Sequence, residues 1–507
     1  MATNPMKFMN RNAVMNLCVV AVLGTIATPA GNAQNISREP NFSEHIAPII
    51  FNNCTSCHRP GEGAPFSLMN YADVKKRGRL IAGVTEQRFM PPWHAESADY
   101  QYADERRINE SEIATIQTWV KRGMPEGDAA KLPKIPDFPE GWQLGTPDLV
   151  VKMSEGFTVP ADGPDIYRNF VIPLNLKKDK WVKAVEFRPG ARGVVHHSLF
   201  FLDVSGQARQ MDADDPKPGF KRMGQGVQRG GTLGGWAVGG TPRELPEGLA
   251  FKLPAKADLI LSTHFHPSGK EETEVSTLGI YFSEKPPTKG FTALQLPPVF
   301  GALAGVDIPA GEKSYTKTDS FVLPVDVRAF AVSAHSHYLG KEMKMTATLP
   351  TGATKELLWI KDWDFSWQEQ YNYKDYVDLP AGTRIDGKVV WDNSAANIHN
   401  PSNPPQRVKW GKESTDEMGS VTLQMVTKRS SDLRKLNTAI GKHRRDAGTA
   451  AIRNRFADRD GAGGGQLLKR LIAKYDKDGD GKLNQAERQA AIRAVPLEDR
   501  RRLFRSR

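Results

Sequence analysis

The stretch Val194-Val195-His196-His197-Ser198-Leu199-Phe200-Phe201 places two adjacent imidazoles in a run that otherwise has the apolar composition of a buried strand. Neighbouring side chains of a regular strand point to opposite faces, so both rings can reach one point only through a bulge, a twist or a strand end. Two interpretations fit this stretch alone: one core and one surface histidine, or two ligands that serve one purpose. Histidines elsewhere in the chain favour the second.

Short runs rich in valine, isoleucine, phenylalanine and tyrosine recur between glycine- and proline-containing turns from about residue 148 to 428. This spacing predicts antiparallel β-sandwiches, and the length allows two, at 148–288 and 289–428. A polar, glycine-rich insert at 205–240 is expected to be an exposed loop. The proline-rich segment 129–147 is typical of a linker.

Two further histidine pairs lie within the predicted sandwiches. His335 and His337 are two residues apart in an apolar strand, so the strand period places both on one face. His264 and His266 repeat this spacing, and Met418 directly precedes another apolar run. Imidazole combined with a thioether favours copper that cycles through Cu(I), because sulfur is a soft ligand. Each pair alone is more often structural, but their combination predicts copper sites.

The first 33 residues have the features of a cleavable secretory signal. Lys7 and Arg11 form a basic start, an apolar run follows, and small residues precede an expected cleavage near Ala33. We therefore expect the protein in the periplasm or outside the cell. No later segment is long and apolar enough to span a bilayer.

The cysteines beyond this signal are Cys54 and Cys57, and His58 follows them. This is the attachment pattern of c-type haem, in which two thiols bind the vinyl groups and the histidine binds the iron. A redox dithiol would not need the histidine, and no second cysteine pair exists to complete a zinc site. The segment 40–128 thus resembles a small α-helical class I c-type cytochrome.

The sixth iron ligand is less defined by the sequence. Met90 is the first choice, since the prolines in Met90-Pro91-Pro92-Trp93 stiffen its loop. Met69, His94 and Met124 are alternatives, because spacing does not decide among them. A final helix is predicted over 109–122, where apolar residues recur on one face.

The tail from residue 429 onward has a helical pattern and contains Asp476-Lys477-Asp478-Gly479-Asp480-Gly481-Lys482-Leu483-Asn484-Gln485-Ala486-Glu487. Acidic residues at loop positions one, three and five, glycine at six and glutamate at twelve match an EF-hand calcium loop. The one candidate mate begins at Asp458 and has Lys469 at its twelfth position, so we expect a degenerate half. The expected calcium ligands are the side chains of Asp476, Asp478, Asp480 and Glu487, the backbone carbonyl of Lys482, and Asn484 through water.

The net charge of +11 is concentrated in this tail. Residues 429–507 contain 21 Lys and Arg against 10 Asp and Glu, which equals the net charge of the whole chain. The rest is balanced, so the charge gives no reason to expect a nucleic-acid partner. A solvated helical face is one interpretation, and contact with an acidic partner or surface is the other.

Four motifs in order carry a family resemblance: His-His at 196–197, Ser-Thr-His-Phe-His at 262–266, Ala-His-Ser-His-Tyr-Leu-Gly-Lys at 334–341 and Thr-Asp-Glu-Met at 415–418. The series resembles the copper type II, ascorbate-dependent monooxygenases, which include peptidylglycine alpha-hydroxylating monooxygenase and dopamine beta-monooxygenase. The resemblance covers about residues 148–428. It implies two jelly-roll-like sandwiches that each hold one copper and face each other across a wet cleft.

The same resemblance implies a role for each ligand. The electron-accepting copper would be held by His196, His197 and His264. The copper at which oxygen binds and the substrate is hydroxylated would be held by His335, His337 and Met418, the expected catalytic residues. His266 has no counterpart in the pattern.

This chain also departs from the peptide-amidating members of the family. They hold the substrate carboxylate with an arginine at the position of Ser333, and have asparagine and tyrosine at the positions of Ser420 and Thr422. A glycine-extended peptide is therefore not the expected substrate. We expect a copper-dependent monooxygenase acting on a small organic substrate, with electrons passing from an external donor through the haem. The alternative is a non-catalytic haem and copper protein stabilised by calcium.

Overall fold

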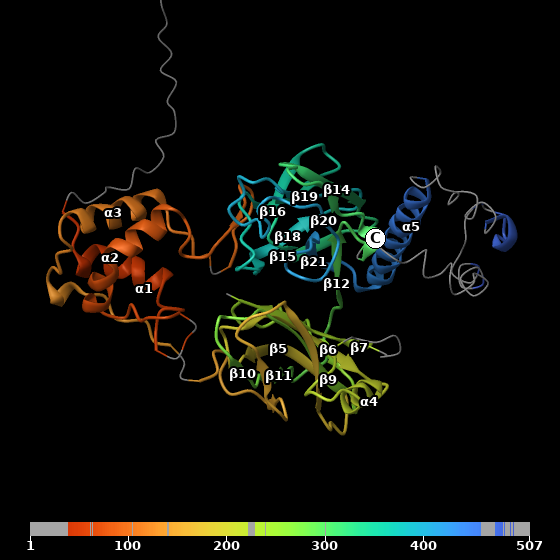
Figure 1. Ribbon diagram of the computed structural model, residues 1–507, viewed down its shortest axis with the longest axis horizontal. Coiled ribbons are helices and arrows are strands. Elements are labelled where there is room, and N and C mark those ends of the chain that lie inside the picture. The colour runs from red at the N-terminus through yellow and green to blue at the C-terminus, as the bar shows by residue number, and fades with distance from the viewer. Residues whose placement is uncertain are drawn as a thin grey trace, which may run out of the picture.

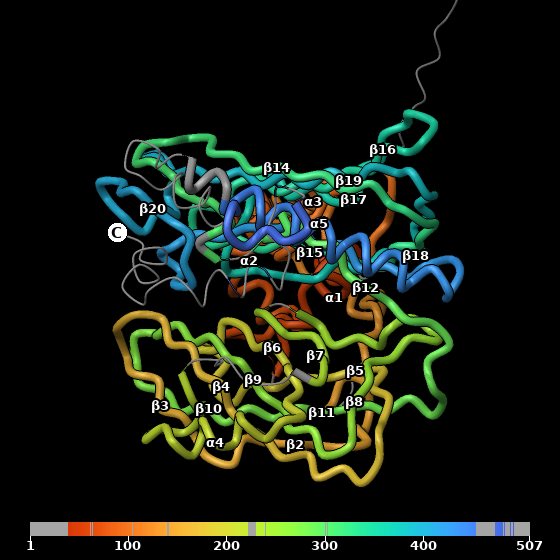
Figure 2. Tube along the Cα trace, turned by 90° about the vertical axis from the view of Figure 1, so that its right-hand side faces the viewer, coloured from red at the N-terminus to blue at the C-terminus, as the bar shows by residue number. Residues whose placement is uncertain are grey.

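The computed structural model describes residues 39–60, 62, 64–103, 105–138, 141–221, 229–238, 240–299, 301–457, 472–479, 481, 487 and 490 (Figure 1). The expected signal at 1–33 lies outside them. Most of the described regular structure consists of antiparallel β-sheets. A small helical unit lies beside two β-sheet units, which lie one above the other in Figures 1 and 2. Within the described ranges, no helix has the length and apolar character needed to cross a membrane.

The helical unit contains η1 (Phe42–Ile46), α1 (Ala47–Asn53), α2 (Tyr71–Glu86) and α3 (Glu110–Lys121). The helix predicted over 109–122 is confirmed as α3. Asn109 and Glu112 form a capping box, in which each side chain accepts from the backbone N–H of the other at 2.9 and 2.7 Å. Buried apolar side chains from these helices form a separate small core around Phe42 and Trp119.

The first sandwich has two four-stranded sheets, with strand orders β2-β11-β5-β8 and β4-β9-β6-β7. Their inner faces share one core, in which Phe200, Leu202 and Leu261 are fully buried. The strands are β2 (Leu149–Lys152), β4 (Ile166–Pro173), β5 (Lys180–Arg188), β6 (Val195–Asp203), β7 (Arg229–Ala237), β8 (Phe251–Leu253), β9 (Asp258–Phe265) and β11 (Thr277–Phe282), and a small pair is formed by β3 (Phe157–Val159) and β10 (Glu272–Glu274).

The second sandwich has sheets of order β12-β21-β15-β18 and β1-β17-β16-β19-β14 around a second core. Leu436 and Ile440 of α5 (Leu433–Ala457) belong to this core, so the helix lies against the sandwich (Figure 2). The strands are β1 (Ala95–Glu96), β12 (Phe291–Leu296), β14 (Tyr315–Val322), β15 (Val327–Ser336), β16 (Gly340–Thr348), β17 (Thr354–Ile360), β18 (Gln370–Leu379), β19 (Arg384–Trp391) and β21 (Gly419–Thr427), with β13 (Asp307–Ile308) paired to β20 (Val408–Lys409).

The segment between α2 and α3 leaves the helical unit and joins the second sandwich. β1 pairs with β17, and Tyr102 forms an antiparallel bridge with Tyr373 of β18. Trp93, Ala95 and Tyr102 are buried in the core of that sandwich. The sequence predicts one unit over 40–128, whereas this excursion ties the helices to the second sandwich.

Part of the insert 205–240, expected to be an exposed loop, is instead regular structure. It contributes α4 (Gln207–Ala213) and the strand β7, which pairs with β6. The glycines of β7 allow its backbone to lie close to β6, since a Cβ atom on Gly235 would lie 2.7 Å from Cδ2 of Leu199. A glycine-rich composition suggests a loop, but glycine is also found in strands whose backbone lies close to that of a neighbouring strand.

Candidate metal centre between the two sandwiches

The first histidine group lies where β6 and β9 pair. The register shifts between Val195 and His197, which places His197 opposite His264 of β9. This bulge is one of the devices that bring two adjacent imidazoles to one point. The Nδ1 atoms of His196 and His197 are 3.2 Å apart, and the three histidines offer one nitrogen each within 4.8 Å of the others. The predicted group could therefore hold a metal ion.

Burial keeps His196 and His197 in the neutral form that binds metals. It lowers the pKa of His196 to about 3 and holds the pKa of His197 well below its usual value, and the neighbouring His264 lowers both further. His264 is only 1% exposed, and its Nδ1 has no hydrogen-bond partner among the described residues. A buried polar atom without a partner is costly, so this nitrogen suits a metal ligand.

Asp165 lies behind the first group and connects three segments. Its Oδ2 is 3.2 Å from Nε2 of His264, without hydrogen-bond alignment, and its Oδ1 is 2.7 Å from Nδ1 of His266. The backbone N–H of Ser414, from the second sandwich, donates to Oδ2 at 2.8 Å. Burial alone would raise the pKa of Asp165, but His264, His266 and Ser414 bring it below its ordinary value. His266 thus has a supporting position, and Asp165 was not predicted from the sequence.

We expect Asp165→Asn to weaken metal binding at the first group by about 10- to 100-fold, the usual effect of losing a partner behind a ligating histidine. The amide cannot accept at both positions, so His264 loses its orienting carboxylate. Titration against a copper chelator measures the affinity. The exposed Asp162, changed to asparagine, is the matched control. An unchanged affinity in Asp165→Asn would contradict this role.

The second histidine group lies at the end of β15. Ser336 pairs with Gly419 of β21, so the register continues toward His337 and Met418. Nδ1 of His335 is 2.5 Å from Oε1 of Gln368, and Nδ1 of His337 is 3.0 Å from the carbonyl oxygen of Asp416. Both partners are acceptors, so each ring donates through Nδ1–H and keeps the lone pair of Nε2 for a metal.

The two groups adjoin each other directly. The ring centroids of His197 and His335 are 6.5 Å apart, and those of His335 and His337 are 5.4 Å apart. Burial lowers the pKa of His335, and lowers the pKa of His337 to about 3. The family resemblance implies a wet cleft between two separate sites, whereas here the imidazoles of the two sandwiches face each other at close range.

The loop 361–369, between β17 and β18, covers both groups. The ring of Phe365 stacks on His196, with centroids 4.2 Å apart, and lies 5.8 Å from the ring of His337. Its carbonyl oxygen accepts from Nε2 of His196 at 3.1 Å, which leaves Nδ1 of that ring for a metal. This loop was not predicted to be part of the site, although its alternating Trp363, Phe365 and Trp367 are a signal of a packed loop.

Glu417 anchors the second group from inside the sandwich. It is fully buried, and its carboxylate accepts from the backbone N–H groups of Leu339, His337 and Met418 at 2.6, 3.1 and 3.2 Å. The side chains of Ser336 and Trp391 add bonds of 3.0 and 2.9 Å. Burial raises the pKa of Glu417 to about 8, against the opposing effect of these donors. This carboxylate joins the end of β15 to the residue that precedes β21.

The predicted haem-attachment residues lie at the end of α1, and the described cysteines Cys54 and Cys57 are free thiols. Burial raises the pKa of the Cys54 thiol to about 12. Nδ1 of His58 is 3.1 Å from the carbonyl oxygen of Phe66. A ring that donates through Nδ1 keeps Nε2 free, as an iron ligand requires. This orientation fits the prediction, and haem itself stays a prediction.

The candidates for the sixth ligand have different surroundings. Met90 lines a cavity of about 290 Å³ together with Trp93 and Ile108. The sulfur of Met124 packs against α2, since a Cβ atom on Gly78 would lie 2.4 Å from it. Nε2 of His94 is buried without a partner among the described residues, and Met69 lies two residues before α2. Packing occupies Met124, while Met90 borders open space.

The structure describes part of the predicted calcium loop. Asp476, Asp478 and Glu487 place one carboxylate oxygen each within 4.8 Å of the others. Glu487 is 4% exposed, and it accepts from the backbone N–H of Lys477 at 2.7 Å. The other expected ligands and the degenerate mate lie outside the described residues, namely Asp480, Lys482, Asn484 and 458–469.

Comparison with known proteins assigns no family to this chain. No family model matches it, and no curated protein matches it. A peptide-N(4)-(N-acetyl-beta-D-glucosaminyl) asparagine amidase structure is 10% identical with a TM-score of 0.26, covering 55% of this chain and 96% of that chain. PNGF-II is 10% identical with a TM-score of 0.23, covering 55% and 65%. The VP2 subviral particle of infectious bursal disease virus is 7% identical with a TM-score of 0.16, covering 57% and 74%.

Proposed function

We propose that this protein is an exported copper-dependent monooxygenase, similar to the copper type II, ascorbate-dependent enzymes, that hydroxylates a C–H bond of a small organic substrate with dioxygen. The observation that supports it most is the junction of the sandwiches. There, the imidazoles of His196, His197 and His264 adjoin His335 and His337, whose Nδ1 atoms hydrogen-bond to Gln368 and to the carbonyl of Asp416. A nitrogen-rich group beside a histidine–thioether group suits a copper pair.

Two copper ions would be held by His196, His197 and His264, and by His335, His337 and Met418. Bound copper supplies one-electron redox chemistry and a site for dioxygen. The chain fixes which nitrogen each ring presents: the Phe365 carbonyl orients His196, and Gln368 orients His335. The ring of Phe365 also shields His196 from water on its stacked face.

The proposed electron donor within the chain is a haem c attached at Cys54 and Cys57, with His58 and Met90 as iron ligands. One electron at a time would reach the copper pair, so an external donor must reduce the haem again within each turnover. The hydrogen bond from His58 to Phe66 supports the ligand role of that ring. Export through the segment 1–33, which has the features of a secretory signal, is part of the same proposal.

The substrate we propose carries no carboxylate. Ser333 pairs with Thr422, and His335 pairs with Ser420, so three small hydroxyl residues lie on the strands that end at the second group. Arginine stands at the position of Ser333 in amidating enzymes. A small neutral molecule fits these residues better than a peptide terminus.

Oxygen consumption tests the proposed function. Protein loaded with copper and haem is supplied with a reductant and a panel of small C–H substrates, and oxygen uptake is recorded with product formation. We expect uptake that depends on substrate and is lost in Met418→Ala, which should retain the first copper. A protein that binds both coppers but takes up no oxygen would instead be a non-catalytic electron carrier.

Calcium is proposed to stabilise the tail through the loop 476–487. We expect Glu487→Gln to weaken calcium binding by at least about 100-fold, because the residue at position twelve supplies two of the oxygen ligands. Calorimetric titration of metal-free protein measures the affinity. Glu498→Gln, which changes the same charge eleven residues further on, is the control. Equal calcium affinities in the two variants would rule out the loop 476–487 as the calcium site.

A further inference from the structure

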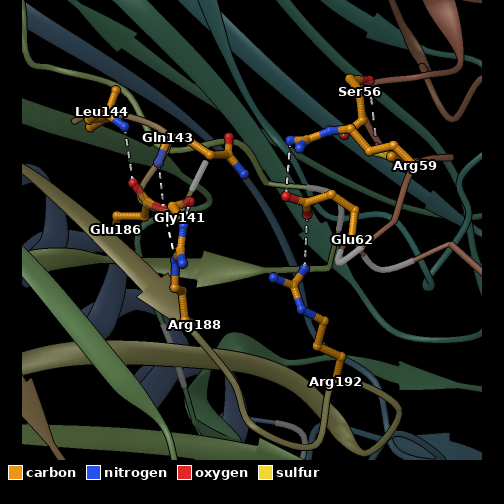
Figure 3. Close-up of polar contacts among 10 residues, drawn as sticks. Ser56, Arg59, Glu62, Gly141, Gln143, Leu144, Glu186, Arg188 and Arg192 are labelled. Atoms are coloured by element: carbon orange, nitrogen blue, oxygen red, sulfur yellow. Dashed lines mark hydrogen bonds and ion pairs between the residues drawn. The ribbon is translucent and has the colours of Figure 1, made fainter. Parts of the chain in front are cut away.

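The segment that follows the haem-attachment motif contacts the first sandwich next to its histidine strand. The side chain of Glu62 is 14% exposed and lies between two arginines, at 3.0 Å from Arg59 and 3.5 Å from Arg192 (Figure 3). Arg192 lies four residues before His196. The guanidinium of Arg59 also stacks over the ring of Phe138 at 4.2 Å. One carboxylate therefore joins the attachment segment to the turn that leads into β6, the strand that carries His196 and His197.

The end of the linker is attached to the same sandwich. Glu186 of β5 accepts from the backbone N–H groups of Gln143 and Leu144 at 3.0 and 3.2 Å, as Figure 3 shows. Arg188 bonds to both Glu186 and the carbonyl oxygen of Gly141. The linker was expected to be a spacer, but its last residues are held on β5, which limits how far the helical unit can move.

A second ion pair attaches the helical side of the chain to the second sandwich. Arg106 donates to both carboxylate oxygens of Glu369 at 3.2 and 2.6 Å, and the two side chains are 12% and 6% exposed. Such a bidentate pair fixes geometry as well as charge. Burial would lower the pKa of Arg106, but the neighbouring Glu369 raises it above its ordinary value.

Glu369 belongs to the loop that contacts both histidine groups. Its neighbour Gln368 accepts from Nδ1 of His335 and donates to the carbonyl oxygen of Phe365 at 3.1 Å. The same carbonyl accepts from Nε2 of His196. A short, continuous series of bonds therefore leads from Arg106 to His335 and to His196. Packed and hydrogen-bonded contacts of this kind are what a fixed domain arrangement requires.

We propose that Glu62 and Glu369 are positioning residues that dock the haem-attachment unit across both sandwiches, and that the loop 361–369 connects it to both histidine groups. The inference rests on the proposed function and deepens it. An electron that leaves reduced haem iron would reduce a cupric ion at either group, leaving ferric haem and cuprous copper. The haem would therefore serve the second copper through Gln368 as well as the first copper.

Two measurements on the full chain test this. The first measurement uses metal-free, haem-free protein. The Glu369→Gln substitution should raise the hydrogen–deuterium exchange of the loop 361–369. The Glu62→Gln substitution should raise the exchange of the segment around Glu62. In loaded protein, haem is reduced by a light pulse under anaerobic conditions and its reoxidation by copper is followed by absorbance. We expect the double variant to slow this step by at least about tenfold, with unchanged haem and copper contents.

The control is Asp307→Asn, which removes a bidentate pair with Arg407 in the same sandwich, away from the loop. His264→Ala should retain haem reoxidation through the second copper, and adding Gln368→Leu should slow it. Complete loss of haem reoxidation in His264→Ala alone would overturn the inference that the haem also reduces the second copper. Unchanged exchange in both glutamate variants would overturn the docking. If the wild-type chain binds no copper, the proposed function fails while the exchange measurement still decides the docking.

Discussion

Replacing His264 with alanine is expected to remove one metal ion per chain and to lower oxygen uptake by more than about 100-fold, beyond the effect of losing an outer partner. His264 offers the one buried Nδ1 of the first group that has no hydrogen-bond partner among the described residues. It also stacks on Tyr167 with centroids 4.2 Å apart, so no other side chain can take its place without repacking. Metal analysis of the purified variant measures the loss.

The second group should keep its metal in this variant, because Gln368 and the carbonyl of Asp416 still hold His335 and His337. The exposed His399, changed to alanine, is the matched control and should retain both ions. Loss of both metals in His264→Ala would mean that the close groups form one site instead of two. Retention of both would exclude His264 as a ligand.

The largest effect on stability is expected from Glu417→Gln, which should lower the free energy of unfolding by about 3 kcal/mol. Five N–H and O–H groups converge on this buried carboxylate. A glutamine amide would point an N–H group at one of these donors, leaving it unpaired inside the protein. Urea denaturation monitored by tryptophan fluorescence measures the change.

The exposed Asp375 on β18, changed to asparagine, controls for the exchange of a carboxyl for an amide group and should alter stability by less than about 0.5 kcal/mol. Glu417→Gln should also weaken copper at the second group more than at the first, since Glu417 holds the backbone of both His337 and Met418. A stability equal to that of the control would show that the buried carboxylate has no anchoring role.

The sequence predicted the features that depend on how apolar residues repeat along a short stretch of chain. Alternating apolar strands indicated two sandwich units. The pair His196-His197 indicated a bulge, a twist or a strand end, and β6 contains a bulge at that position. The helix over 109–122 was predicted from its apolar face and follows a capping asparagine. These features arise within a few neighbouring residues, so a single stretch of sequence contains their cause.

The missed features arise from contacts between distant segments. Asp165 touches Ser414, and Arg106 pairs with Glu369, across separations that no local pattern encodes. The burial of Glu417 depends on five donors from three segments, while its charge alone predicts an exposed side chain. The glycine-rich β7 was mistaken for a loop because the close approach of β6, which explains its glycines, becomes visible only in the paired sheet.

We propose that the adjoining histidine groups hold two copper ions that activate oxygen. Copper per chain and reductant-driven oxygen uptake, measured on one sample of mature protein, decide whether they do. We predict two coppers per chain, with one lost selectively in Met418→Ala and oxygen uptake lost with it. A single copper per chain, or zinc at both groups, would contradict the account.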